Sequence, residues 1–310
     1  MSIEFCEKSG FIKRPLKKRD IGPRRPGDFP MPPFPQLLGL FPPRSATVGL
    51  EGLYLGLGLH RLGSPAAPFV YANFVSSLDG RIALEDAGGK TYLPKRLTSP
   101  NDFRLFLELH AQADCLVTHG GYLRALAAGR LGNILQVGAH EAGHDLPAWR
   151  EAQGLPPQPA VVVASASLDF PLPPSLRAHG QTCYIATGAK ADPAKVAYWR
   201  DQGYEVLVAG PGKAVAGGAL TRQLGGLGYR TPYLVAGPRM LETMVRDGCL
   251  SRLFLTTTHQ LLGGLGFHGL LPGPELGEAG RLRLISLYYD AEMPADAGQC
   301  FAQFAPGAIL

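Results

Sequence analysis

The segment from Asn73 to Arg81 carries the residues best suited to chemistry. It follows an apolar run, Phe69–Ala72, and therefore reads as a buried strand that ends in a tight Leu78-Asp79-Gly80 turn. In open α/β sheets, small ligands bind at the carboxyl ends of strands. Asn73 can form paired hydrogen bonds with the edge of a heterocycle, and Asp79 can orient a substrate or relay a proton. The competing interpretation gives Asp79 a turn-stabilising bond and makes Asn73 a backbone cap.

Glycine gathers at two places where a predicted strand meets a helix. The first is Thr118-His119-Gly120-Gly121-Tyr122, and the second is Leu234–Leu241, which includes Gly237, Pro238 and Arg239. Bare backbone amides at the start of a helix, together with the helix dipole, favour phosphate binding. Glycine also allows close packing of a helix on a strand, so neither junction identifies a site by itself.

The elements that must position these residues alternate between strand and helix. Ser99-Pro100, Asp192-Pro193 and Gly237-Pro238 each mark a helix start, with proline at the first helical position. Predicted strands cover 69–75, 114–118, 160–164, 182–186, 205–208, 232–236, 252–258, 281–289 and 299–304. The order predicts an α/β fold with a mostly parallel central sheet, antiparallel C-terminal edge strands and helices on both faces.

Residues 1–66 form a Pro-rich, basic leader that we expect to be partly extended or disordered, ahead of a domain that spans 67–310. Residues 1–30 carry eight bases against four acids, which accounts for +4 of the total charge of +5. The domain itself is close to neutral, which argues against nucleic-acid binding. Apolar stretches at 37–38 and 53–59 indicate that the later part of the leader lies on a surface, either of its own domain or of a partner.

The chain also lacks the signals of membrane and secreted proteins. No run approaches the ~18 apolar residues of a membrane span, and the N-terminus lacks the apolar core of a signal peptide. The five cysteines are odd in number and widely spaced, without a CxxC pair. We therefore expect a reduced, cytoplasmic protein without membrane contact.

The segment 73–81 resembles the first strand of the riboflavin-pathway pyrimidine reductases, whose pattern is Asn-x-x-x-Ser-Leu-Asp-Gly-Lys/Arg. These enzymes are a branch of the dihydrofolate-reductase-like fold, and the resemblance continues over residues 68–310. Further motifs follow in the family's order at Thr98-Ser99-Pro100, Ala111–Val117, Ser165, Ala236-Gly237-Pro238 and Gly248–Gly263.

The resemblance implies a reductase that takes NADPH as cofactor. Its substrate would be 5-amino-6-(5-phosphoribosylamino)uracil or a related phosphoribosyl pyrimidine, reduced by hydride transfer to the ribosyl C1′. Either Arg239 or Arg124 would neutralise the 2′-phosphate of the cofactor. The expected cofactor-binding residues are Val75, Gly120, Gly121, Ser165, Gly237, Pro238 and Arg239. The expected substrate-binding residues are Asn73, Ser99, Arg104 and His110, with Asp79 as the catalytic residue. The family also implies a homodimer formed through sheet edges, which leader residues 37–66 could extend.

The chain departs from the family mainly in the substrate half. His110 stands where the family has an arginine that grips substrate, and Val235 replaces a glutamate. Tyr122 and Leu126 replace a threonine and an aspartate. Histidine lacks the guanidinium fork, although it binds phosphate when protonated. Other candidates to hold the substrate are Arg104, Lys95 and Arg96. A different, pterin-like substrate and a non-catalytic nucleotide-binding protein therefore stay open as alternatives.

Two further motifs suggest other functions. His140-Glu141-Ala142-Gly143-His144 matches the H-E-x-x-H of zinc hydrolases, in which both histidines lie on one helical face. Gly138 and Pro147 flank this segment, so we expect a polar loop and no metal, with a zinc hydrolase as the alternative. Gly264–Gly269 matches G-x-G-x-x-G, but the helix that a Rossmann fold needs does not follow.

Overall fold

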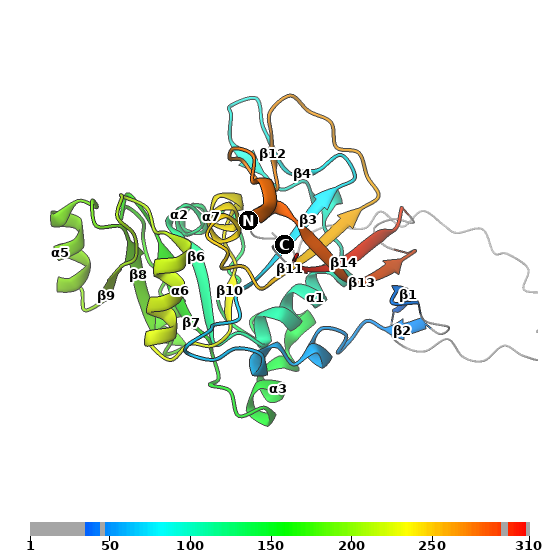
Figure 1. Cartoon of the computed structure of the whole chain (residues 1–310), viewed down its shortest axis with the longest axis horizontal. Helices are drawn as coiled ribbons and strands as arrows, with labels where there is room; N and C mark the ends of the chain where they lie inside the picture. Colours follow the sequence, from blue (N-terminus) through cyan, green and yellow to red (C-terminus); the bar gives the residue numbers. More distant parts are fainter. Residues whose placement is uncertain (1–34, 44–46, 293–296, 308–310) are drawn as a thin grey trace, which may run out of the picture.

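A computed structural model describes residues 35–43, 47–292 and 297–307, and an eleven-stranded sheet forms its centre (Figure 1). The strand order is β2-β1-β13-β14-β11-β3-β10-β6-β7-β8-β9. Neighbours from β11 to β9 are parallel, whereas pairs from β2 to β11 on the other side are antiparallel. The carboxyl ends of the parallel strands therefore lie along one edge of the sheet, where a ligand site is expected.

The parallel strands consist largely of buried residues, as expected where helices cover both faces of a sheet. They are β3 (Tyr71–Ser77), β6 (Cys115–His119), β7 (Ala160–Ala164), β8 (Cys183–Thr187), β9 (Glu205–Val208), β10 (Pro232–Leu234) and β11 (Arg252–Thr258).

The antiparallel strands lie at one side of this sheet and in a second, three-stranded sheet of order β12-β4-β5. The strands of the main sheet are β1 (Gln36–Phe41), β2 (Thr47–Gly49), β13 (Leu282–Asp290) and β14 (Gln299–Pro306). Those of the small sheet are β4 (Arg81–Glu85), β5 (Thr91–Tyr92) and β12 (Phe267–Gly269).

Helices connect the parallel strands. The α-helices are α1 (Pro100–Ala111), α2 (Gly120–Ala127), α3 (Leu146–Ala152), α4 (Ser175–Ala178), α5 (Pro193–Asp201), α6 (Gly217–Gly226) and α7 (Pro238–Arg246). Short 3-10 helices are η1 (Leu55–Leu57), η2 (Leu59–Arg61), η3 (Lys95–Leu97), η4 (Glu141–Gly143) and η5 (Gly277–Gly280). Each of the described helices is too short or too polar to cross a membrane.

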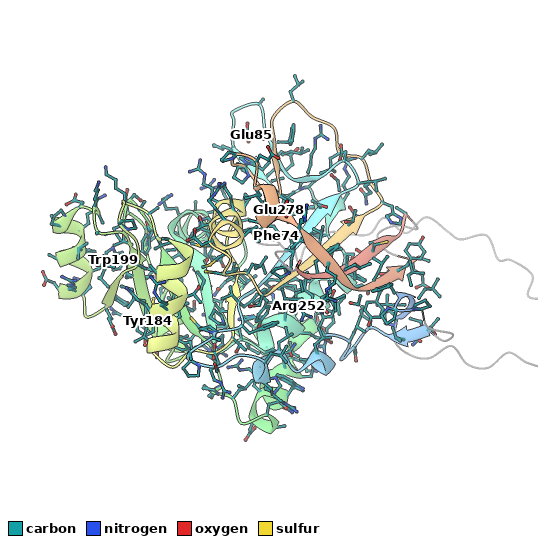
Figure 2. All side chains as sticks on the ribbon, in the orientation of Figure 1. Phe74, Glu85, Tyr184, Trp199, Arg252 and Glu278 are labelled. Carbon is teal, nitrogen blue, oxygen red and sulfur yellow. The ribbon has the colours of Figure 1, made fainter. Side chains whose placement is uncertain are left out.

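Two apolar clusters hold the helices to the two faces of the sheet. The first cluster includes residues of α1, α2, α3, α4 and α5, among them Trp199. The second includes residues of α6 and α7 together with Phe74 of β3 (Figure 2). Side chains of a strand alternate between faces, so Tyr71, Asn73 and Val75 share the face that α1 covers.

Most strands and the three marked helix starts are confirmed. The strands predicted at 160–164, 205–208 and 252–258 match the observed bounds, and Ser99 caps α1 by accepting from the Asp102 amide. β1, β2, the small sheet and α6 were not predicted. Of these, β2, β5 and β12 have only two or three residues, and β1 and α6 contain glycine, so their local pattern is weak.

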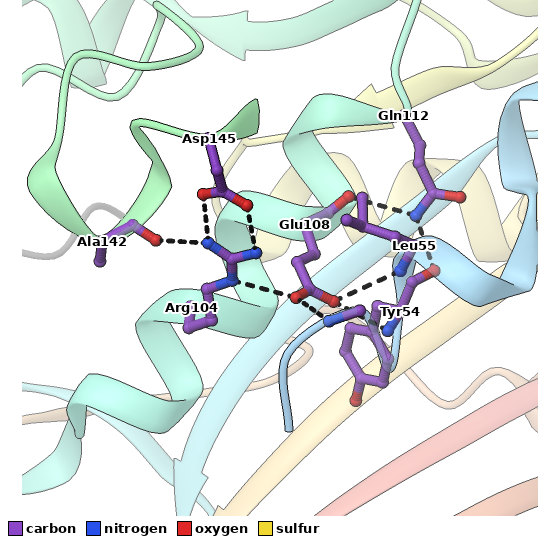
Figure 3. Close-up of polar contacts among 8 residues, drawn as sticks. Tyr54, Leu55, Arg104, Glu108, Gln112, Ala142 and Asp145 are labelled. Atoms are coloured by element: carbon purple, nitrogen blue, oxygen red, sulfur yellow. Dashed lines mark hydrogen bonds and ion pairs between the residues drawn. The ribbon is translucent and has the colours of Figure 1, made fainter. Parts of the chain in front are cut away.

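The second half of the leader packs on the domain's own surface (Figure 3). The buried Glu108 of α1 accepts hydrogen bonds from the backbone amides of Gly52, Tyr54 and Leu55, at 2.6, 2.9 and 3.3 Å. Gln112, one turn later, accepts from the Leu59 amide at 2.8 Å. Residues 50–61 are therefore fastened to α1 through side chains of the helix. Residues 1–34 lie outside the described part of the chain, and the division at residue 66 stays a prediction.

Candidate active site at the carboxyl edge of the sheet

The His119 ring lies between the two glycine turns at the ends of β6 and β10. An added Cβ at Gly121 would lie 2.8 Å from Nδ1 of this ring, and one at Gly237 would lie 3.6 Å from Nε2. The turns that begin α2 and α7 therefore face each other across one imidazole. Burial lowers the pKa of His119 to about 4, so the ring is neutral near pH 7. His119 was not among the predicted site residues.

The loop that follows β7 covers the start of α2. An added Cβ at Gly120 would lie 2.8 Å from the Phe170 ring and 3.2 Å from Ser165 Oγ. Within this loop Leu168 has a φ of 54°, a left-handed conformation that is rare for leucine. Trp199 donates to the Leu168 carbonyl at 3.1 Å, and Arg124 donates to the Asp169 carbonyl at 2.6 Å. Such fixed backbone strain is concentrated at ligand sites in proteins.

Val75 and the start of α7 lie at the same height along the strand direction, at the carboxyl edge of the sheet. Ala72 of β3 pairs with Leu234 of β10, and Val75 and Gly237 each lie three residues further on. Pro238 takes the first position of α7, and Arg239 follows it with an exposed side chain. The glycine turns, Ser165, Val75 and Arg239 thus come from separate parts of the chain to one edge. Backbone amides at two helix starts with nearby arginines form a suitable cradle for phosphate groups.

Asp79 holds the turn after β3 in place. Its carboxylate accepts from the Ser77 hydroxyl and the Arg81 guanidinium, and from the amides of Leu262 and Gly263 at 3.2 and 2.9 Å. The hydrogen bonds from Ser77 and Gly263 are the main reasons why its pKa is lowered. An ionised carboxylate with this many donors is a poor proton relay near pH 7, so the geometry favours the turn-stabilising interpretation.

Two predicted substrate-binding residues, Ser99 and Arg104, bond partners inside the protein, and a third, His110, is enclosed without a hydrogen-bond partner for either ring nitrogen in the described part of the chain. Ser99 caps α1 and bonds Gln299. Arg104 donates to Glu108, to both carboxylate oxygens of Asp145 and to a carbonyl (Figure 3). His110 is only 1% exposed, and its pKa is lowered to about 3, first by burial. A neutral, enclosed imidazole does not fit phosphate binding, so the expected role of His110 is not supported.

Asn73 and the neighbouring bases are more accessible. Asn73 is partly exposed and lies beside the buried Tyr233 hydroxyl. Lys95 and Arg96 are exposed on η3, which packs against β3, and Arg96 donates to the Leu262 carbonyl at 3.4 Å. Among the residues predicted to hold a substrate, Asn73 and the bases of η3 are therefore the accessible ones.

Asp102 is an acid in the first turn of α1. The structure buries it to 1% exposure, with a hydrogen bond from Thr256 of β11 and no partner for Oδ1. Thr256 pairs with Val75, so this carboxyl group lies under the same stretch of sheet as Asn73. Burial raises its pKa to about 6. A perturbed, incompletely bonded acid next to a candidate site is a functional signal that sequence alone does not give.

The H-E-x-x-H segment has neither the helix nor the geometry of a zinc site. It forms the 3-10 helix η4, with His140 in an extended conformation before it. His140 and His144 bond the carbonyls of Asn133 and Glu141, at 2.8 and 2.7 Å. Within residues 35–43, 47–292 and 297–307, no three metal-binding side chains gather at one place. The zinc-hydrolase alternative therefore receives no support.

Known structures share this architecture at low sequence identity. A pyrimidine reductase-like protein from Corynebacterium diphtheriae is 18% identical, with a TM-score of 0.57 over 78% of this chain and 92% of that one. The riboflavin biosynthesis reductase of Saccharomyces cerevisiae is 12% identical, with a TM-score of 0.52 over 82% of this chain and all of that one. RibD of Acinetobacter baumannii is 16% identical, with a TM-score of 0.50 over 78% of this chain and 58% of that one.

The fold is thus the dihydrofolate-reductase-like one that the sequence predicts, with a mostly parallel sheet and helices on both faces. No curated protein matches the sequence. The model of the RibD C-terminal domain family matches residues 68–292, which is more than half of the chain. The chain therefore belongs to the RibD C-terminal domain family.

Proposed function

We propose that this protein is an NADPH-dependent reductase of the riboflavin-biosynthesis type. Its substrate would be 5-amino-6-(5-phosphoribosylamino)uracil or a related phosphoribosyl pyrimidine. The observation that carries the proposal is the meeting of two glycine-bearing helix starts around His119, in a chain of the RibD C-terminal domain family. The proposal is further supported by the similar yeast structure, which is that of a riboflavin biosynthesis reductase.

The cofactor would lie along the ends of β10, β6 and β7. Its diphosphate would bind the amides of Gly120, Gly121 and Gly237, which carry no side chains of their own and lie next to the His119 ring and Ser165. Ser165 and the exposed Arg239 would hold the 2′-phosphate, with Arg124 fixing the loop around Ser165. When bound, the nicotinamide supplies the hydride, and the protein positions it against the substrate carbon.

The substrate would lie beyond the nicotinamide, against β3 and η3. Asn73 would bind the pyrimidine edge, and Lys95 and Arg96 would attract the ribosyl phosphate. In this arrangement Asp79 positions the Leu262–Gly263 backbone next to the substrate and does not transfer a proton.

The first test is a titration of the purified full chain with NADPH and with NADH, followed by an NADPH-oxidation assay. The pyrimidine and dihydrofolate are offered in parallel. We expect preference for NADPH and oxidation that depends on the pyrimidine. Oxidation with dihydrofolate alone would favour a pterin-like substrate. NADPH binding without oxidation by either would favour a non-catalytic nucleotide-binding protein, and no NADPH binding would refute the proposal.

We also propose that the protein is a cytoplasmic homodimer and that β1 takes part in the contact. Leu38, Leu40 and Phe41 are 46%, 46% and 44% exposed, on a strand next to the outer edge of the sheet. Clustered exposed apolar side chains are typical of protein interfaces. Sedimentation should give a dimer for the full chain and a shift toward monomer for Leu38→Glu with Leu40→Glu. A monomeric full chain would contradict this.

A further inference from the structure

Two arginines flank one alanine on the antiparallel side of the sheet, at the amino end of β11. Leu253 of β11 pairs with Phe304 of β14, so Arg252 stands opposite Ala305. Arg283 of β13 pairs with the same alanine from the other side. Residues opposite each other in a ladder project from the same face of a sheet. The side chains of Arg252 and Arg283 therefore leave one face of the sheet on either side of Ala305.

These two cations have no acidic partner. The ion pairs formed within residues 35–43, 47–292 and 297–307 include neither Arg252 nor Arg283. Arg252 is only partly exposed, and its pKa is lowered by burial and then by the positive charge of Arg283. The fold thus holds two like charges close enough to repel each other. A partly buried cation without a counter-charge is unfavourable, and an anion between the two arginines would compensate both.

The inner arginine is held in a fixed position. Gln303, which lies two residues before Ala305 on the same face of β14, is 2% exposed. Its Oε1 accepts a hydrogen bond from Arg252 at 2.8 Å. The guanidinium also lies over the Phe69 ring, with its central carbon 5.5 Å from the ring centroid. A cation that is fixed by a buried amide and an aromatic ring is organised in the way that binding sites require.

The space between the arginines suits a phosphate group. Two strand spacings separate their Cα atoms, which is about 10 Å, so two long side chains can converge on one ligand. Ala305 ends at its Cβ and leaves the gap open, and both Arg252 and the exposed Arg283 are accessible from solvent. Planar guanidinium groups bind the oxygens of phosphate in pairs. The arrangement is therefore that of an anion clamp.

This clamp lies far from the candidate active site. Arg252 begins β11 (Figure 2), whereas Thr258 ends the same strand at the carboxyl edge of the sheet. A strand of this length places the two ends about 20 Å apart. A ligand held by Arg252 and Arg283 would therefore not occupy the glycine turns proposed to bind NADPH.

We propose that Arg252 and Arg283 form a second anion site, which binds a phosphate group over Ala305. The ligand is inorganic phosphate or the phosphate of a phosphomonoester. Each guanidinium donates to phosphate oxygens, and Gln303 keeps Arg252 in place. This site adds a ligand to the protein beyond the cofactor and the substrate of the proposed function, and it does not depend on them.

The test follows the arginine Nε–Hε signals of the full chain by NMR at pH 7.5 and constant ionic strength. NADP⁺ is present in excess to fill the proposed cofactor site, and inorganic phosphate and ribose 5-phosphate are titrated separately. We expect a saturable shift of the Arg252 signal. Arg283→Gln should weaken binding roughly tenfold or more, because it removes hydrogen bonds to a charged ligand. Arg283→Lys should recover part of the affinity, since it restores the charge without the fork.

Two further variants separate a built site from general attraction by positive charge. Ala305→Leu keeps both arginines but fills the gap between them, so phosphate binding should be lost. Arg200→Gln, which removes an exposed charge on α5, should leave the affinity unchanged. Tighter binding of ribose 5-phosphate would identify a phosphomonoester as the ligand, and equal binding would identify the anion alone.

The inference would be overturned by the absence of a saturable shift, or by wild-type affinity in Arg283→Gln or Ala305→Leu. The titration is also run without NADP⁺. If the cofactor does not bind, the reductase proposal fails, and a shift of the Arg252 signal that is lost in Ala305→Leu would still support the second site.

Discussion

At the ends of β6 and β10, each glycine proposed to bind cofactor lies within a few positions of the end of its own strand. Gly120 and Gly121 begin α2 directly after β6, and Gly237 caps α7 shortly after β10. Around α1, by contrast, the polar groups come from β3, β10, β11 and residues 50–61. The proposed cofactor side is thus built from local strand-turn-helix units, whereas the proposed substrate side is built from long-range contacts. Changes on the two sides should therefore have different effects on stability and binding.

The largest effect on folding is expected at Glu108, on the long-range side. Its side chain has no exposed surface and accepts from three backbone amides and Arg104. Glu108→Ala should lower the free energy of unfolding by about 3–5 kcal/mol, because it leaves buried donors unpaired. Urea unfolding measures this loss, with Glu151→Ala, an exposed acid of α3, as the control. A loss below about 1 kcal/mol would show that residues 50–61 are held by other contacts.

A second experiment tests whether the substrate side carries a destabilising acid. The pKa of Asp102 is raised from 3.8 to about 6 by folding, which corresponds to about 3 kcal/mol. Because the pKa of Asp102 is higher in the folded than in the unfolded state, its contribution to the free energy of unfolding is fully present below pH 4. This contribution is lost as the pH rises to 6. Relative to Asp102→Asn, the wild type should therefore lose about 3 kcal/mol between pH 4 and 7 in urea unfolding. Parallel curves for the two proteins would contradict this.

On the cofactor side, binding should change without loss of stability. Gly237 has a φ of −73°, which any residue adopts, and an added Cβ meets only the His119 ring at 3.6 Å. Gly237→Val should nevertheless weaken NADPH binding roughly tenfold to hundredfold. The added side chain would crowd the bound cofactor, and overpacking of this kind costs about 1–3 kcal/mol. Gly226→Ala on α6, where nothing lies near the added atom, is the matched control. Fluorescence titration measures the NADPH affinity of each variant. Unchanged affinity in Gly237→Val would show that the start of α7 does not bind the cofactor.

The smallest effect is expected at the exposed bases of η3. Replacing Lys95 and Arg96 together by glutamine should raise KM for the phosphoribosyl pyrimidine about threefold to tenfold with little change in kcat, because exposed charges contribute up to about 1 kcal/mol each. The pyrimidine without phosphate should be unaffected. If KM stays the same, the phosphate binds elsewhere on the substrate side.

The same contrast explains which features the sequence could predict. Proline after a capping residue identifies α1, α5 and α7, and glycine after an apolar run identifies the turn at Gly120. These signals lie within a few residues, so they can be read without the fold. Other features depend on segments more than thirty residues away, such as those with Asp145 and Thr256. These features are the enclosure of His110, the ion pairs of Arg104 and the burial of Asp102. Residue type alone could not show that these side chains are enclosed.

The attachment of residues 50–61 to α1 also bears on where this protein can be cut. The family model begins at residue 68, so a chain truncated by homology would start after every amide that Glu108 accepts from in this segment. The helix that carries Asp102 and Ser99 would then expose its outer face, including Glu108 and Gln112, to water. We expect such a chain to be poorly soluble or inactive even though it contains every family motif. For this protein, a chain meant for expression or for a chimeric protein should therefore begin before residue 50 and not at the start of the homologous region.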